Sequence, residues 1–240
     1  MSEPFNPFAA PEMRNDVQAQ AVGSYQKLVG VERGLRLIYF GICGVFLSAM
    51  ATAVLAIAIG PRARIGFVGV IISWLMVIIG PFFCLSVPAE SRARGLISAS
   101  ILFQLTGFFL AMALRTSVVD LPPALQFLSE LFGVTGGVLF ILFLMKVARF
   151  IGREDLRRRG INVLIGSVVL FVIAVFAVYS VTFRGRGNTE SIGLIAIGIA
   201  GVGALVIFLM YANLVNYLTK AIGSLRSGSA TNEVTGRYLG

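Results

Sequence analysis

The chain has 240 residues, of which 57% are hydrophobic and only 13% are charged, and its mean hydropathy is +0.89. A typical soluble domain carries about 25% charged residues, so too few charges are present here to cover a water-facing surface. The composition therefore predicts a membrane protein. It excludes a secreted disulfide scaffold, a soluble Rossmann-type enzyme and a disordered chain.

The net charge of the chain is +9, from 20 Lys and Arg against 11 Asp and Glu. In a soluble protein such an excess would raise the question of nucleic acid binding. In a membrane protein, basic residues flank the spans and contact acidic lipid headgroups. We therefore expect a bilayer with anionic lipids, and no nucleic acid, as the partner of this chain.

Charge-free apolar intervals predict six transmembrane helices, because a span needs about 20 mainly apolar residues. The fourth helix in chain order must take in Glu130, Lys146 or both, since the charge-free run between them is too short to cross. The predicted spans are 37–60, 65–87, 95–116, 125–150, 161–183 and 192–218. The expected fold class is all-α, an integral membrane bundle.

The distribution of basic residues predicts the orientation. The segments before the first span, after the even-numbered spans and at the end of the chain hold 15 of the 20 Lys and Arg, which places both termini in the cytoplasm. We expect residues 1–30 to form a partly disordered cytoplasmic segment, 31–219 the membrane domain and 220–240 a flexible tail. Apolar residues at helical spacing before the first span indicate one of two structures. The segment is either a short helix on the membrane surface or a plain extension of the first span in which Glu32 and Arg36 form a pair.

A dense basic run follows the fourth span. We expect its arginines to rest on anionic lipid and to fix the topology, and a docking site for a cytoplasmic partner is the alternative. The candidate lipid contacts are Arg153, Arg157, Arg158 and Arg159.

Small residues at four-residue spacing mark the first span, and such residues let helix backbones approach closely in a bilayer. We interpret the stripe as a helix-packing seam, with a hinge or a pore lining as the alternative. Its members are Gly44, Ser48, Thr52, Ala56 and Gly60.

Polar residues within spans are few, and each is a candidate functional group. Glu130 lies near the outer end of the fourth span and Arg115 at the outer end of the third, so we expect a structural ion pair, with proton or cation binding as the alternative. Gln104 lies near the middle of the third span and is expected to hydrogen-bond a neighbouring helix. Trp74, central in the second span, is expected to be buried.

Polar residues also gather at the cytoplasmic end of the sixth span. They would either meet headgroup water, which we favour, or bind a polar ligand. These residues are Tyr211, Asn213, Asn216 and Tyr217.

Signatures of catalysis are missing from the sequence. The chain contains no His, which excludes His-based acid–base catalysis and His ligation of zinc or haem, and Cys43 and Cys84 form no metal or disulfide pattern. There is no P-loop, G-x-S-x-G or HExxH motif. We expect no enzyme activity, no catalytic or metal-binding residue and no cofactor.

Three short motifs resemble those of a group of uncharacterised bacterial multi-pass inner-membrane proteins. They are Asn6 to Pro11 (NPFAAP), Arg33-Gly34-Leu35 and Cys84 to Ser91 (CLSVPAES). The resemblance implies that the chain lies in a bacterial inner membrane. The group has no established activity, so the resemblance implies no role for any residue. The sequence thus favours a noncatalytic membrane subunit or scaffold that binds lipid or other membrane proteins, among them a second copy of this chain. A small channel or permease is the alternative.

Overall fold

The structure is a computed structural model that describes residues 13–59, 65–115, 123–183 and 190–238. Within these ranges the chain forms six α-helices and one short 3-10 turn, η1, which confirms the predicted all-α class. The helices are α1 (Met13–Ile59), α2 (Ile65–Cys84), α3 (Arg94–Arg115), α4 (Pro123–Phe150), α5 (Glu154–Phe183) and α6 (Glu190–Tyr238), with η1 (Ala89–Ser91) between α2 and α3.

Four stretches of these helices are long and apolar enough to cross a membrane: Leu28–Thr52, Arg94–Leu114, Leu128–Phe150 and Gly201–Leu225. The described apolar part of α2, Val68–Cys84, is shorter. The chain therefore has the composition and helix lengths of a membrane protein, while six crossings and the sides of the two termini stay predictions.

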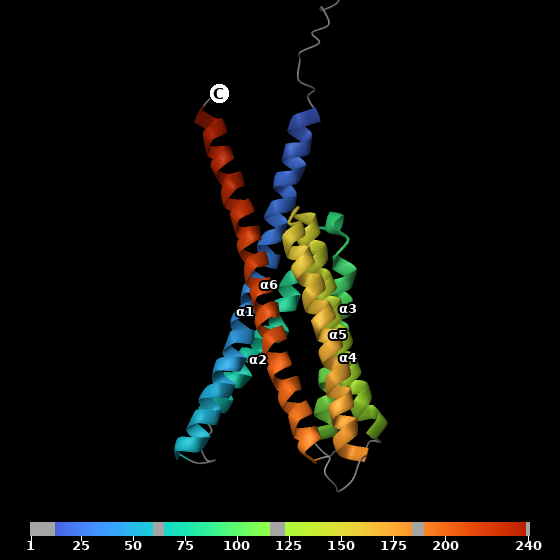
Figure 1. Cartoon of the computed structure of the whole chain (residues 1–240). Coiled ribbons are helices and arrows are strands. Elements are labelled where there is room, and N and C mark those ends of the chain that lie inside the picture. The colour runs from blue at the N-terminus through green and yellow to red at the C-terminus, as the bar shows by residue number, and fades with distance from the viewer. Residues whose placement is uncertain (1–12, 60–64, 116–122, 184–189, 239–240) are drawn as a thin grey trace, which may run out of the picture.

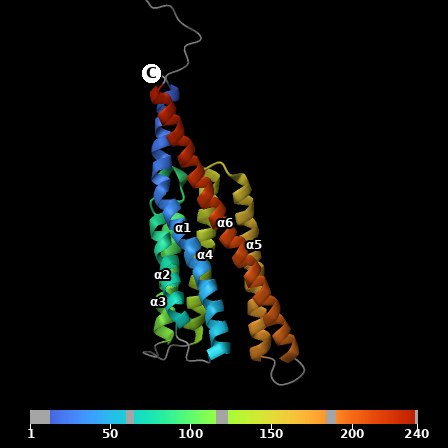
Figure 2. The same ribbon diagram turned by 90° about the vertical axis from the view of Figure 1, so that its left-hand side faces the viewer.

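The helices are arranged as three hairpins packed side by side. The most extensive contacts join α1 with α2, α3 with α4 and α5 with α6, and further contacts join α4 with α5 and α1 with α6. Figure 1 shows α1 and α6 crossing, with their far ends diverging, and Figure 2 shows α4 lying between the first hairpin and α5. The first and last of the described helices thus contact each other where they cross.

The buried core is concentrated at one end of the bundle. This end, called the basic end below, carries the connections α2–α3 and α4–α5, and both α1 and α6 extend past it (Figure 1). The core is built from Leu28–Ile42 of α1, Phe140–Ile151 around the end of α4, and Ala212–Ile222 of α6, with Phe143 as its largest fully buried side chain. Toward the opposite end many apolar side chains are exposed, including Met50 and Val202, as expected for surfaces that face lipid.

Glycines permit the close approach of α1 to α2. A Cβ atom added at Gly34 would lie 2.5 Å from the carbonyl oxygen of Gly80 and 2.8 Å from Sγ of Cys84. Farther along, a Cβ at Gly44 would lie 2.3 Å from Oγ of Ser73. Lipid gives no hydrophobic drive for helix association, so this backbone contact is a main source of packing energy between the two helices.

The turn between α4 and α5 is made by three residues only. Gly152 has a φ of 72°, and its amide donates to the carbonyl of Arg149 (3.0 Å) while the amide of Arg153 donates to that of Ala148 (2.9 Å). This is a Schellman cap, which needs a left-handed residue after the helix. Because α5 then begins at Glu154, the basic run lies on its first turns rather than in a loop.

Three boundaries can be compared with those predicted. The segment before the first span is helical from Met13 and continuous with the span, so it is an extension of α1. At the other end of the chain α6 continues as helix to Tyr238, and no proline interrupts this stretch; the flexibility expected of residues 220–240 stays a prediction. The second helix ends at Cys84, where turn hydrogen bonds lead into Pro88.

The α1–α2 contact is testable by substitution. Gly34→Ala is expected to lower the free energy of unfolding by about 2 kcal/mol, because backbone atoms of α2 occupy the space of the new methyl group. Unfolding in mixed micelles measures the change. The matched control is Gly133→Ala, whose Cβ would meet nothing within 4 Å, and equal effects of the two substitutions would contradict the packing assignment.

Candidate functional site

The most distinctive chemical feature of the described residues is the charge of the basic end. Basic side chains from α1, the α2–α3 connection, α4, α5 and α6 are exposed around it, apart from the half-buried Arg157, and acidic side chains are fewer. The basic residues are Arg33, Arg36, Arg92, Arg94, Lys146, Arg149, Arg153, Arg157, Arg158, Arg159 and Lys220, and the acidic ones are Glu32, Glu90, Glu154 and Asp155. This end therefore offers a net positive surface.

Two of the four candidate lipid arginines pair with acidic neighbours. Arg153 donates from Nε and Nη2 to the two carboxylate oxygens of Asp155, both at 2.9 Å, and Arg157 forms an ion pair with Glu154. The hydrogen bonds from Arg153 lower the pKa of Asp155 to about 2. Glu154 and Asp155 also occupy the first turn of α5, where the helix dipole favours negative charge.

The other two arginines are differently placed. The guanidinium carbon of Arg159 lies 4.7 Å from the centre of the Tyr217 ring, a cation–π contact that ties the start of α5 to α6. Arg158 is exposed, and no ion-pair partner is found for it among the described residues. Within the described ranges, neither Arg158 nor Arg159 forms an ion pair with a carboxylate.

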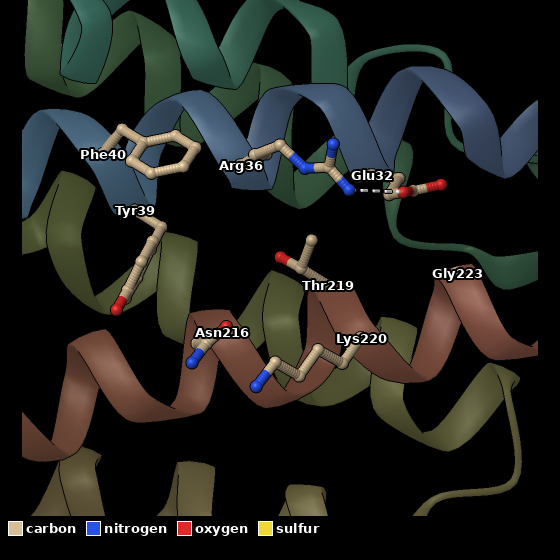
Figure 3. A pocket seen from close by; sticks show the side chains of 8 residues that line it. All are labelled: Glu32, Arg36, Tyr39, Phe40, Asn216, Thr219, Lys220 and Gly223. Carbon is tan, nitrogen blue, oxygen red and sulfur yellow. Dashed lines mark hydrogen bonds and ion pairs between the residues drawn. The ribbon is translucent and has the colours of Figure 1, made fainter.

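A cavity of about 200 Å³ lies where α1 crosses α6 at the basic end. Figure 3 shows its residues on the two helices: Tyr39 and Thr219 point into the space between α1 and α6, Arg36 reaches along α1 to Glu32, and Lys220 lies along α6. The lining residues are Glu32, Arg36, Tyr39, Phe40, Asn216, Thr219, Lys220 and Gly223. Most of the lining surface is apolar, and the charged and polar groups of Glu32, Arg36, Asn216 and Lys220 make up the smaller part.

One wall of the cavity is organised by an ion pair within α1. Nη2 of Arg36 donates to Oε1 of Glu32 at 3.1 Å; the Glu32 side chain is 7% exposed, whereas that of Arg36 is 61% exposed. A buried carboxylate is costly unless it is paired, so Glu32 fixes the position of the arginine. Across the cavity, a Cβ at Gly223 would lie 3.6 Å from Oε1 of Glu32, which shows how closely α6 approaches.

The structure places Gln104 in the contact between α3 and α4. Its Nε2 donates to Oγ of Ser100 (3.3 Å), and the Ser100 hydroxyl donates to the carbonyl oxygen of Gly136 on α4 (2.7 Å). A Cβ at Gly136 would lie 2.6 Å from Cγ of Gln104. Gln104 thus packs against α4, but its hydrogen bond goes to Ser100 of its own helix. Only the Ser100 hydroxyl bonds α4 directly.

The remaining candidate residues are distributed along the bundle. Glu130 is exposed on α4, and the side chain of Arg115 lies outside the described residues, so the expected ion pair is not described. Trp74 was expected to be buried, but it is 43% exposed and its ring lies 5.0 Å from that of Phe108 on α3. Helices α2 and α3 share few contacts, and part of the Trp74 side chain therefore stays exposed.

The small-residue stripe of α1 faces α2 over its described part. Besides the Gly44 contact, Oγ of Ser48 lies 2.6 Å from the position of a Cβ on Gly69, and Thr52 donates from its hydroxyl to the carbonyl of Ser48 (2.6 Å). The side chain of Ala56 and the whole of Gly60 lie outside the described residues.

The described residues contain no candidate metal site. No three His, Cys, Asp or Glu side chains group there in a way that could hold a metal ion. The chemistry available at the basic end is the binding of anions by guanidinium, ammonium and amide donors.

Sequence reasoning missed the cavity. Arg36 was considered only as a partner for Glu32, Lys220 only as a flanking charge, and Phe40 only as a member of the first span. Asn216 was considered as a ligand-binding residue, but nothing in the spacing of α6 indicated that α1 lies opposite it. The one available signal was Glu32, an acidic residue four positions before Arg36 at the start of an apolar run.

The Arg153–Asp155 pair gives a testable pH dependence. Because the pKa of Asp155 is below its usual value of 3.8, the pair stabilises the turn above that value and loses its contribution as the pH falls through about 2. Carboxyl NMR shifts of Asp155 should report this pKa, and Arg153→Gln should return it toward 3.8. An unchanged pKa in Arg153→Gln would contradict the pairing.

The Ser100 hydrogen bond is testable in the same molecule. Ser100→Ala is expected to lower the free energy of unfolding by about 1 kcal/mol, because the Gly136 carbonyl and the Gln104 amide each lose a buried partner. Ser98→Ala is the matched control, since the exposed Ser98 hydroxyl donates only to Arg94 of its own helix. Equal stability of the Ser100→Ala variant and the unmodified chain would refute this role.

Comparisons with protein-family models, with curated proteins and with solved structures find no match to the chain.

Proposed function

We propose that this chain is a noncatalytic multi-pass protein of the bacterial inner membrane, with both termini in the cytoplasm. It acts as a membrane subunit or scaffold and binds anionic lipid at its basic end. The observation that carries the proposal is the pair Arg158 and Arg159 on the first turns of α5, neither of which forms an ion pair with a carboxylate among the residues that the structure describes. Anionic headgroups are the negative partners available at a membrane surface.

The packing of the bundle supports this role. Its core is densest beneath the basic residues, and its exposed apolar side chains lie mainly along the rest of the helices. A positively charged end above lipid-facing helices attracts anionic headgroups without any reacting group. The short α4–α5 connection keeps the arginines close to the headgroup level.

Passage of a small solute, the alternative from the sequence, requires a polar path that reaches Gln104 or Glu130. The cavity between α1 and α6 is lined by neither residue. Gln104 is engaged with Ser100 in the α3–α4 contact. These placements favour the scaffold over the permease.

The lipid proposal predicts a charge effect confined to one end. Arg158→Gln/Arg159→Gln is expected to lower the ratio of bound phosphatidylglycerol to phosphatidylcholine by roughly 30-fold, since each of the two basic residues near a surface contributes about 1 kcal/mol. Native mass spectrometry of the chain released from mixed nanodiscs measures the ratio. A higher salt concentration should reduce the preference further.

The control removes the same charge elsewhere. Arg184→Gln/Arg186→Gln changes the connection between the fifth and sixth spans, which the distribution of basic residues assigns to the other side of the membrane. It should leave most of the preference intact. The proposal fails if the unmodified chain shows no preference for anionic lipid, or if chain-containing liposomes pass a small solute that empty liposomes retain.

A further inference from the structure

We propose that the cavity between α1 and α6 binds one phosphate group of an anionic phospholipid, held between Arg36 and Lys220 with the acyl chains outside against Phe40. This inference rests on the proposed function and adds to it a specific site at residues that the general lipid contact does not use. Lipid at the α5 arginines is exchangeable and diffuse, whereas the cavity would hold a single headgroup.

The charges of the cavity favour an anion. Glu32 forms an ion pair with Arg36 within α1. Lys220, exposed on α6, has no acidic partner at ion-pair distance among the described residues. Two cations and one carboxylate therefore line the cavity, which leaves a net positive charge for an anion to neutralise.

The donors of the cavity suit phosphate. Arg36 keeps N–H groups beyond the one that it donates to Glu32, Lys220 offers three, and Asn216 adds an amide from the preceding turn of α6 (Figure 3). Charge-assisted hydrogen bonds from guanidinium and ammonium groups to phosphate oxygens are among the strongest in proteins. Thr219 donates its hydroxyl to the carbonyl of Val215 (2.8 Å), so it shapes the wall rather than binding.

The position of the cavity favours a lipid over a free ion. Gly34, between Glu32 and Arg36, packs against the last turns of α2, so the charged part of the cavity lies where that apolar helix ends. Phe40 lies one turn farther along α1, and its side chain is 57% exposed. The cavity thus passes from charged to apolar along the helix axis, in the order of a phospholipid headgroup and chain.

The size of the cavity limits what it encloses. Pockets that bury drug-sized ligands measure about 300–1,000 Å³, whereas this one measures about 200 Å³. It therefore has room for a headgroup fragment, and the acyl chains must lie outside it. Exposed apolar residues on the remaining length of α1 and α6, among them Leu47 and Leu209, provide a surface for them.

The test uses the full chain in phosphatidylcholine nanodiscs that contain a minor fraction of phosphatidylglycerol. Native mass spectrometry under activation that strips loosely held lipid is expected to leave one phosphatidylglycerol per chain. Lys220→Gln should lower its occupancy roughly tenfold, the loss expected for one charge-assisted hydrogen bond. Arg94→Gln, which removes one exposed basic residue from the same end, should keep the lipid.

A second arm separates lipid from free phosphate. Inorganic phosphate and glycerol phosphate are added to detergent-solubilised chain, and the thermal midpoint is measured. Phe40→Ala should weaken retention of phosphatidylglycerol while leaving any shift by inorganic phosphate unchanged. A Lys220-dependent shift by inorganic phosphate, with no retained phosphatidylglycerol, would overturn the lipid assignment in favour of a soluble phosphate compound.

The outcomes distinguish the site from the proposed function. If the unmodified chain retains no anionic lipid and gains no stability from phosphate, both are overturned. If it prefers phosphatidylglycerol, loses that preference in Arg158→Gln/Arg159→Gln and keeps it in Lys220→Gln, only the cavity site is overturned. Equal thermal midpoints of Lys220→Gln and the unmodified chain without ligand show that the substitution leaves the fold intact, as expected for an exposed lysine.

Discussion

Helices in a bilayer gain nothing from hiding apolar side chains from one another, because lipid tails receive those side chains equally well. Association must then come from close backbone contact and from buried hydrogen bonds. Both occur here: Gly34 lies against Gly80 in the first hairpin, and Ser100 donates to the carbonyl of Gly136 in the second. The other features of the bundle depend on these contacts, since they fix the hairpins that later meet one another.

The hairpins meet tightly at one end only. There, α1, α4 and α6 bury a continuous core around Phe143, whereas toward the other end the helices diverge and present apolar surface to lipid. Exposed cations and the buried core therefore coincide at the basic end.

The sequence predicted much of this fold and little of the site. Intervals between charges predicted six helices, because a charge within a span is costly, and Glu32 and Arg36 at four-residue spacing predicted their pair. The α1–α6 crossing was not predictable, since a stripe of small residues on one helix does not indicate which other helix packs against it. The prediction that Trp74 is buried was wrong for a similar reason. The local sequence pattern does not distinguish an apolar residue that faces lipid from one that faces protein.

The α1–α6 crossing also has a consequence for biogenesis. Membrane helices are inserted as they leave the ribosome, and the hairpin α1–α2 is complete long before α6 is synthesised. The walls of the cavity therefore come from the earliest and the latest parts of the bundle, with Arg36 and Lys220 separated by most of the chain. Until α6 is synthesised, the cavity wall that contains Glu32 and Arg36 has no opposite wall.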